Sequence, residues 1–365
     1  MKAPARTFLP RMEISLFQIQ DNVRILSNLY GLKGIALMGV TKAVLGEPAI
    51  ARAMIKGGAT FIADSRIENI QKMRKSGISA RFVLLRTPPS QAKETVLNAD
   101  ISLNTELETL KRLSFYAKNY SKCHQVIIMV ELGDLREGIL PCDLSRFIRE
   151  TLSLPYIKLI GIGSNLACHG GVKPDELNMQ QLSRLADFLE REFQISLEII
   201  SGGNSANYEW YQSARDIDRV NNLRLGESIL LGCETVNRKA IPGLHRNAFQ
   251  LIAEVIESKE KPSIPSGEIC QDAFGDTPSF KDRGIHQRVI IALGRQDIFI
   301  SSLKPGNPLE ILGSSSDHII LDGNGHNLKV GDEVRFSLDY AGLLSAMTSP
   351  FIRKHFINHK SNAAA

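Results

Sequence analysis

The chain has little of what marks several large classes of protein. Its five cysteines among 365 residues are widely spaced and form no Cys-x-x-Cys pair, which argues against a disulfide framework and against a thiolate zinc site. No apolar run approaches the roughly 20 residues of a membrane span, and the N-terminus lacks the apolar core of a signal peptide. We therefore expect a protein of the reducing cytoplasm with no membrane partner and no bound metal.

Charge of one sign is not concentrated anywhere in the chain either. The formal net charge is +5, and Lys and Arg are scattered among Asp and Glu without a basic block interleaved with aromatics. This pattern argues against a nucleic-acid partner. A mildly basic chain can still attract anions such as phosphate esters. The 43% hydrophobic content is enough for a sizeable core, and the length suggests two domains or one large domain.

Apolar strand-like segments alternate with amphipathic helical patterns from about residue 35 to residue 232. The expected strands end near eight positions: Lys42, Asp64, Arg86, Asn104, Glu131, Asn165, Ser201 and Arg224. Eight strands with intervening helices match a TIM-like (β/α)8 barrel, an α/β fold. The alternative is a doubly wound open sheet, whose dinucleotide-binding Gly-x-Gly-x-x-Gly loop is absent after the first strand. Capping boxes at Ser65–Glu68 and Thr105–Glu108 predict two of the helix starts.

The pattern changes after Gly232. Four short strand candidates follow, separated by turns rich in Gly and Pro: 249–256, 288–293, 318–322 and 333–338. They predict a smaller C-terminal β domain. We expect residues 12–238 to form the barrel and residues 239–365 to form the β domain, with an added strand from residues 1–11.

Lys42 ends the first buried strand of the expected barrel. In barrel enzymes the chemistry takes place where strands end, and a desolvated lysine there has a depressed pKa and can form a Schiff base. A lysine at a strand end can also be a side chain that only extends to solvent. Its position alone leaves both interpretations open.

The loops after the seventh and eighth strands indicate a phosphate site. In Ser201–Asn207 the glycines let backbone amides approach an anion, and Ser205 offers a hydroxyl. Arg224–Glu227 follows the eighth strand, and these two loops are the usual phosphate site of the fold. A phosphate-anchored cofactor together with a Schiff-base lysine points to pyridoxal phosphate.

The chain resembles the alanine-racemase-type (fold type III) pyridoxal phosphate enzymes, and most closely the branch often labelled alanine/ornithine racemase. Seven segments carry the resemblance in family order: Val40–Lys42, Ala63–Ile70, Glu131–Gly138, Gly161–Asn165, Ser201–Asn207, Asn222–Glu227 and Leu343–Pro350. The resemblance implies a racemase that interconverts L- and D-amino acids (ornithine, lysine or alanine) through a Lys42 aldimine and Cα proton transfer. It also implies a homodimer with shared active sites.

The resemblance assigns cofactor contacts as well. Lys42 is expected to hold the cofactor, and Arg224 to face its pyridine nitrogen. An arginine keeps its proton, so the ring becomes a weaker electron sink and racemisation is favoured over transamination. The other expected cofactor-binding residues are Arg136 near the phenolic oxygen or the substrate carboxylate, Asn165 at the ring, Ser205 with the amides near Gly226 and Glu227 at the phosphate, and also Asn204 and Tyr340.

One feature of the family pattern is missing. Alanine racemases place a tyrosine of the partner subunit on the face of Cα opposite the lysine, and Arg295 stands at the matching position. Arginine is a poor proton shuttle, so Arg295 is expected to bind the substrate carboxylate. The opposite-face catalytic acid is then expected among Asp272, Asp317, His318 and Tyr340. Four acidic residues are candidates for binding a cationic substrate side chain: Asp272, Asp276, Asp297 and Glu131.

Two other functions stay open at this point. The first is a non-catalytic carrier of pyridoxal phosphate, resembling single-domain homeostasis proteins that lack a β domain. The second is another fold type III reaction, either decarboxylation or aldol cleavage. Decarboxylases favour an acidic partner at the ring nitrogen, which Arg224 is not, and aldol cleavage needs metal ligands whose spacing is not evident here.

Overall fold

The computed structural model describes residues 9–306, 308–323 and 325–357. The chain divides into two compact units. One unit spans Leu16–Arg246, and the other joins the described residues up to Ser15 with those from Asn247 onward. The parts of the expected β domain that fall on residues 1–8 and 358–365 lie outside the described residues. None of the described helices is long and apolar enough to cross a membrane.

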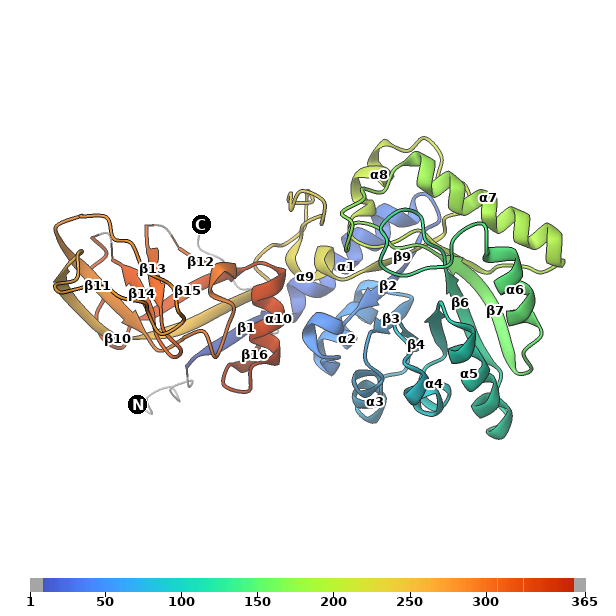
Figure 1. Ribbon diagram of the computed structural model, residues 1–365, viewed down its shortest axis with the longest axis horizontal. Helices are drawn as coiled ribbons and strands as arrows, with labels where there is room; N and C mark the ends of the chain where they lie inside the picture. The colour runs from blue at the N-terminus through green and yellow to red at the C-terminus, as the bar shows by residue number, and fades with distance from the viewer. Residues whose placement is uncertain (1–8, 307, 324, 358–365) are drawn as a thin grey trace. The chain divides into compact units, whose positions relative to one another are not determined.

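Eight parallel strands of the first unit close into a barrel (Figure 1). They are β2 Ala36–Val40, β3 Phe61–Asp64, β4 Arg81–Leu84, β5 Ile101–Asn104, β6 His124–Met129, β7 Ile157–Gly163, β8 Ile199–Ser201 and β9 Asn222–Leu225. Pairing of β9 with β2 closes the ring, so the open sheet is excluded and the expected barrel is confirmed. Each strand ends within two residues of its expected position.

Helices connect and surround the barrel strands (Figure 1). They are α1 Leu16–Gly31, α2 Pro48–Gly57, α3 Ile67–Lys75, α4 Ala92–Asn98, α5 Leu107–Asn119, α6 Leu144–Leu152, α7 Glu176–Phe193, α8 Asn207–Ser213 and α9 Glu227–Leu231, with 3-10 turns η1 Lys42–Val44 and η2 Pro89–Gln91. Each of the longer helices buries one apolar face, as the sequence pattern predicts.

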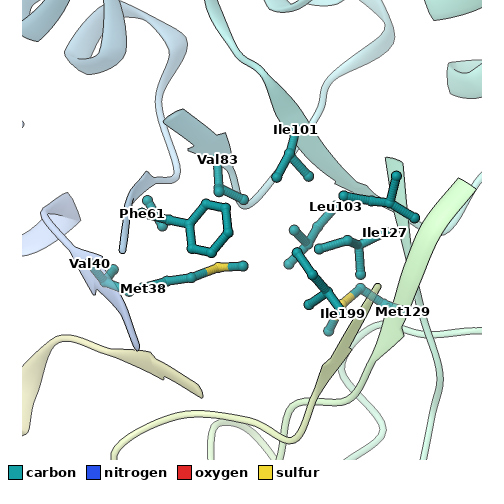
Figure 2. Packing of buried hydrophobic residues seen from close by; sticks show 11 residues of the cluster. Met38, Val40, Phe61, Val83, Ile101, Leu103, Ile127, Met129 and Ile199 are labelled. Atoms are coloured by element: carbon teal, nitrogen blue, oxygen red, sulfur yellow. The ribbon is translucent and has the colours of Figure 1, made fainter. Parts of the chain in front are cut away.

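Apolar side chains fill the barrel interior (Figure 2). The labelled residues are Met38, Val40, Phe61, Val83, Ile101, Leu103, Ile127, Met129 and Ile199. Strand β9 contributes none of them. Instead, its Asn222 accepts a hydrogen bond from Ser201 Oγ at 2.8 Å, and its Arg224 donates to the same oxygen at 2.5 Å. Polar groups therefore enter the interior where β8 meets β9.

The two expected capping boxes are wrong. Neither Ser65 nor Thr105 occupies the N-cap position of its helix, and neither helix start has a side-chain capping bond. At α3 the buried carboxylate of Asp64 accepts hydrogen bonds from the Arg66 amide and from Asn69 Nδ2, both at 2.9 Å. A carboxylate at the end of β3 thus holds the start of α3 in place of the expected capping box.

The second unit is built on a mainly antiparallel sheet in the order β12-β15-β10-β11-β14-β13. Its elements are β1 Arg11–Ser15, β10 Phe249–Pro262, β11 Ile285–Ile291, η3 Ile300–Ser302, β12 Leu303–Pro305, β13 Glu310–Ser314, β14 Ile319–Asp322, β15 Glu333–Leu338, α10 Tyr340–Thr348 and β16 Arg353–Ile357. Strand β1 lies between β10, to which it is antiparallel, and β16, to which it is parallel.

The boundary between the units lies at other residues than the sequence suggests. Strand β1 belongs to the second unit, although the expected barrel begins at residue 12. Residues 239–246 belong to the barrel unit. Asn22 on α1 donates to the His245 carbonyl at 2.9 Å and accepts from the His245 amide at 2.7 Å. This pair of hydrogen bonds holds the segment after α9 on the barrel.

Arg11 links β1 to β15 across β10. Its guanidinium, 8% exposed, bonds Glu333 at 2.7 and 2.8 Å and Glu13 at 2.9 and 3.1 Å. Arg335 bonds the other oxygen of Glu13 at 2.8 Å. The hydrogen bond from Arg11 lowers the pKa of Glu333. Burial raises the pKa of Glu13, but the bonds from Arg335 and Arg11 outweigh it and leave that pKa lowered.

We expect Arg11→Met to lower the free energy of unfolding by about 2–3 kcal/mol, since hydrogen bonds to charged groups contribute ~1.5–3 kcal/mol. Both carboxylate pKa values are lowered in the folded state. The network's contribution is therefore present above the unfolded pKa and is lost as the pH falls through the folded values. Denaturation at pH 7 and at pH values below about 4.5 checks both effects. Arg112→Met, which removes an exposed helix pair with Glu108, is the control. Equal pH dependence in the wild type and Arg11→Met would contradict the prediction.

Candidate active site

Lys42 stands at the carboxyl end of the barrel, directly after β2 and at the start of η1. Its side chain is exposed there, yet surrounding protein atoms displace much of its hydration, and this burial lowers the pKa of the ammonium group. The charges of Cys168, Asp64 and Glu137 oppose the shift, whereas that of Arg136 adds to it. A lowered pKa enlarges the fraction of neutral amine, which is the nucleophilic form.

Strand β3 holds the backbone that carries Lys42. Thr41 Oγ1 donates to Asp64 Oδ2 at 2.7 Å, while the other carboxylate oxygen receives the bonds from the start of α3. Asp64 is fully buried. Burial raises the pKa of this carboxyl, although its hydrogen bonds favour the charged form. The hydrogen bonds of Asp64 thus fix the turn that carries Lys42, and none of them involves the lysine amine.

Arg224 places a buried cation on β9, opposite Met38 of the strand that leads to Lys42. Its side chain on β9 is 5% exposed, and it donates to Ser201 Oγ, to the Ser164 carbonyl at 2.6 Å and to Asn165 Oδ1 at 3.2 Å. Burial lowers the pKa of Arg224 to about 10, and the charge of Glu137 opposes this shift. The guanidinium therefore keeps its protons at neutral pH.

Asn165 connects Arg224 to the loop after β8. Its Oδ1 also accepts from Asn204 Nδ2 at 3.1 Å, and the same nitrogen of Asn204 contacts the Leu166 carbonyl at 2.8 Å and Cys168 Sγ at 3.5 Å. The amide nitrogen of Asn165 is buried and has no acceptor within the described part of the chain. An unmade hydrogen bond of this kind is costly, so the nitrogen is suited to a bound acceptor.

The loops after β8 and β9 lie against each other. The Ser205 hydroxyl accepts from the Ser228 amide at 3.1 Å and lies 3.0 Å from the Ser228 hydroxyl. Among the residues that the structure describes, the amides of Gly226 and Glu227 donate to no protein acceptor. The Glu227 carboxylate forms an ion pair with Arg238. Two open amides beside a serine hydroxyl are suited to an anion.

Gly203 gives the loop after β8 its shape. Its φ is +146°, and a Cβ atom there would lie 2.2 Å from Asn207 Oδ1. That oxygen accepts the Asn204 amide at 2.9 Å. Only glycine satisfies both the backbone angle and the close approach.

Arg136 and Glu137 form an ion pair in the loop after β6. Arg136 Nη2 donates to Glu137 Oε1 at 2.5 Å, and a second contact joins Nε to Oε2. The two side chains are 38% and 36% exposed. Arg136 lowers the pKa values of Lys42 and Arg224, and Glu137 raises them. Both side chains therefore influence the pKa values of Lys42 and Arg224.

Arg295 and Asp272 lie together in the second unit. The Arg295 guanidinium stacks on Phe274 at 3.8 Å from the ring centroid and donates to Ser314 Oγ at 3.0 Å. Asp272 accepts the Phe274 amide at 2.8 Å, and this bond, with a smaller effect of the Arg295 charge, lowers its pKa. A groove of about 730 Å3 beside Arg295 is lined by residues 295–301, Ser314, Ser345 and residues 348–350.

His318 lies on the same turn that Arg295 contacts. His318 Nδ1 is 2.9 Å from Asp317 Oδ1 and 3.4 Å from Ser315 Oγ, and the Ser315 carbonyl accepts the Arg295 amide at 3.0 Å. A carboxylate at one ring nitrogen orients the imidazole and leaves Nε2 for proton exchange. Tyr340, which was expected to bind the cofactor, is the first residue of α10.

Two side chains near Lys42 and Arg224 were not expected from the sequence. Cys168 follows Asn165 by three residues and Glu137 follows Arg136 directly, and both act on the charge of Lys42. Their places in loops that follow barrel strands were the available signal. No group of three or more His, Cys, Asp or Glu residues suited to a metal ion occurs among the residues described.

Comparison with known proteins gives a consistent result. The family model described as "Alanine racemase, N-terminal domain" matches residues 14–233. The chain is 41% identical to ornithine racemase of Acetoanaerobium sticklandii over 353 residues, which cover 95% of this chain and 99% of the relative. It is 38% identical to lysine racemase of Thermotoga maritima over 348 residues, covering 94% and 98%. The fold is similar to that of alanine racemase from Streptomyces coelicolor A3(2), with a TM-score of 0.76 at 18% identity over 96% of this chain and 98% of the other.

Proposed function

The chain belongs to the alanine racemase family, and we propose that it interconverts the L and D forms of a basic amino acid, ornithine or lysine. Like its relatives, it is a pyridoxal-phosphate-dependent amino-acid racemase. The choice of a basic substrate is carried by one observation. The ornithine and lysine racemases match nearly the whole chain at 41% and 38% identity, including both units.

The residues at the carboxyl end of the barrel fit pyridoxal phosphate. Lys42 supplies an accessible amine of lowered pKa, and Asn165 an unpartnered buried nitrogen. The open amides of Gly226 and Glu227, with Ser205, supply donors for a phosphate. When bound, the cofactor draws electrons from the Cα of an attached amino acid.

We assign the proton transfers at the barrel to named atoms. Lys42 Nζ serves one face of Cα: it removes the proton of one enantiomer, and in the reverse direction it delivers a proton to that face. Arg224 keeps its protons and would give none to the ring nitrogen of a bound cofactor, which would then withdraw electrons from Cα only weakly, so that reprotonation at Cα would be favoured. Arg136 binds the phenolic oxygen or the substrate carboxylate, and Asn165 and Asn204 orient the ring. Tyr340 is retained as a cofactor-binding residue on the resemblance alone.

The second unit is proposed to complete the active site of the other subunit in a homodimer. Arg295 binds the substrate carboxylate, and Asp272 or His318 exchanges the proton on the face opposite Lys42. This assignment is supported by the grouping of Arg295, Asp272 and the His318–Asp317 pair around one turn. His318 is chemically suited because an imidazole can both accept and donate a proton.

Shared sites predict complementation between two inactive variants. Lys42→Ala and Arg295→Ala each remove one half of a site. A mixed dimer of the two then carries one site with both residues intact, so unfolding and refolding an equal mixture is expected to restore about a quarter of wild-type activity. Racemisation by the refolded mixture, compared with each variant refolded alone, measures this. No recovery, in a mixture shown to be dimeric, would mean that the sites are not shared.

We propose the cytoplasm as the location of the protein. All five cysteines are free, and four of them are exposed. Exposed free thiols persist where glutathione and thioredoxin keep them reduced.

A deuterium-exchange panel tests the proposed activity. The protein with pyridoxal phosphate is incubated in D2O with L-ornithine, L-lysine or L-alanine, and both Cα deuteration and the D-enantiomer are followed. Inversion on ornithine or lysine supports the proposal, whereas much faster inversion of alanine would overturn the proposed substrate. Exchange without inversion would remove the assigned opposite-face acid. Cofactor binding without any exchange would favour a carrier, and amine or aldehyde products would favour decarboxylation or aldol cleavage.

A further inference from the structure

We propose that Glu137 binds the distal ammonium group of the substrate and makes the site selective for basic amino acids. The inference rests on the proposed racemase function and adds the residue that selects the substrate class. The inference comes from comparing the hydrogen-bond partners of the acidic side chains at the carboxyl end of the barrel and of those expected from the sequence.

The buried carboxylates at this end of the barrel are engaged by the protein itself. Asp64 receives hydrogen bonds from Thr41, Arg66 and Asn69. Asp134 is fully buried and accepts the amides of Cys168 and His169, the latter at 2.9 Å. Both side chains hold loops in place and are not exposed to an incoming substrate.

Three of the four acidic residues expected from the sequence are engaged as well, and the fourth, the exposed Asp276, belongs to the second unit. Glu131 is 9% exposed and accepts the Gly133 amide at 2.5 Å. Asp297 is also 9% exposed and accepts the Gly294 amide at 2.9 Å. Asp272 accepts the amides of its own turn. These bonds satisfy backbone donors, so moving the carboxylates to a ligand would leave those donors unpaired.

Glu137 differs in exposure and in the kind of partner that it has. Its side chain is 36% exposed. Among the described residues it forms an ion pair with Arg136, whose side chain is 38% exposed. Exposed ion pairs contribute little to stability, so this pair is easily exchanged. Glu137 lies in the loop between β6 and α6, at the carboxyl end of the barrel that also carries Lys42, and its charge acts on both Lys42 and Arg224.

A basic amino acid can exchange this internal ion pair for two pairs of its own. Any bound carboxylate or phenolate that takes Arg136 leaves Glu137 without its cation. The distal ammonium of ornithine or lysine replaces that cation, whereas a neutral amino acid leaves the carboxylate unpaired. Selectivity thus comes from an added attraction for basic substrates and from an unpaired charge with neutral ones.

Glu137→Gln tests the inference by comparing ornithine with norleucine, in which a methyl group replaces the ammonium. We expect kcat/KM for ornithine to fall roughly 10- to 100-fold, as for loss of a charge-assisted hydrogen bond, and norleucine to change by less than about 3-fold. Glu137→Asp, which keeps the carboxylate, is expected to retain most of the preference. Glu108→Gln removes an exposed glutamate of a helix pair on α5 and serves as the matched control.

A binding measurement separates recognition from catalysis. α-Methylornithine has no Cα proton, so its affinity, followed by the change in cofactor absorbance, reports binding alone. We expect Glu137→Gln to weaken it by the same factor as kcat/KM for ornithine, with α-methylnorleucine little affected. A ratio of ornithine to norleucine within twofold of the wild type, or unchanged α-methylornithine affinity, would overturn the inference while leaving the racemase intact. A wild type that inverts no amino acid would instead overturn the proposed function.

Discussion

Lys42→Ala is expected to lower racemisation of every substrate roughly 10³- to 10⁵-fold, the range typical for loss of a covalent catalytic group. The side chain of Lys42 reaches solvent at the carboxyl end of the barrel, and the surrounding protein atoms lower the pKa of its amine by displacing part of its hydration. Removing it takes away both the attachment point of the cofactor and the proton carrier of one face. Chiral chromatography of the products and the visible absorbance of the lysine-linked cofactor measure the two losses separately.

Two further variants sharpen this prediction. Lys42→Arg keeps the positive charge but not a nucleophilic amine, so it should be as inactive as Lys42→Ala. Lys158→Ala removes an exposed lysine paired with Glu198 at the start of β7 and should leave activity unchanged. A Lys42→Ala protein that kept a tenth of its activity, or kept the lysine-linked absorbance, would show that another amine holds the cofactor.

Arg224→Glu is expected to lower racemisation roughly 10²- to 10³-fold and to divert a larger share of turnovers into 2-oxo acid. The wild-type guanidinium gives no proton to the ring nitrogen that it is proposed to face. A carboxylic acid at the same place can give one, which makes the ring a stronger electron sink and allows the proton to return to a site other than Cα. The ratio of 2-oxo acid to D-amino acid measures the diversion.

Arg224→Gln is the matched control for that change. It also loses the bonds to Ser201, Ser164 and Asn165, but it introduces no acid. Both variants should therefore bind the cofactor less well, and only the glutamate variant should form more 2-oxo acid per racemisation event. Equal product ratios in the two variants would contradict the role assigned to Arg224.

The barrel and the polar residues at its carboxyl end could be predicted because they depend on the local pattern of apolar and polar residues. Each buried strand is a short apolar run that ends in a polar residue, and Lys42, Asp64 and Ser201 mark such ends. In a parallel barrel all strand ends meet at one edge, so the order of these residues along the chain is enough to group them. The resemblance to a known family then attached roles to the same positions.

Other features depend on contacts that a local pattern does not contain. The sequence pattern predicted that Ser65 caps the start of α3. Instead, the carboxylate of Asp64, at the end of β3, accepts the Arg66 amide. Glu131 was expected to be available to a substrate, yet the fold turns it onto Gly133. Whether a carboxylate is free or engaged is decided by loop geometry, which explains why Glu137 was missed. Strand β16 was missed because none of its five residues is fully buried and they show no apolar alternation.

The position of β1 has a consequence for biosynthesis. Arg11 pairs with Ile252 of β10 and with Arg353 of β16, so among the described strands the earliest in the chain is completed by the latest. At translation rates of roughly 5–20 residues per second, β1 waits on the order of tens of seconds for β16. The barrel emerges whole in that interval, and β10, the antiparallel partner of β1, follows the barrel well before β16 does. A nascent chain stalled before Arg353 would keep one edge of β1 open to strands of other chains, so chaperone dependence should fall on synthesis of the last residues.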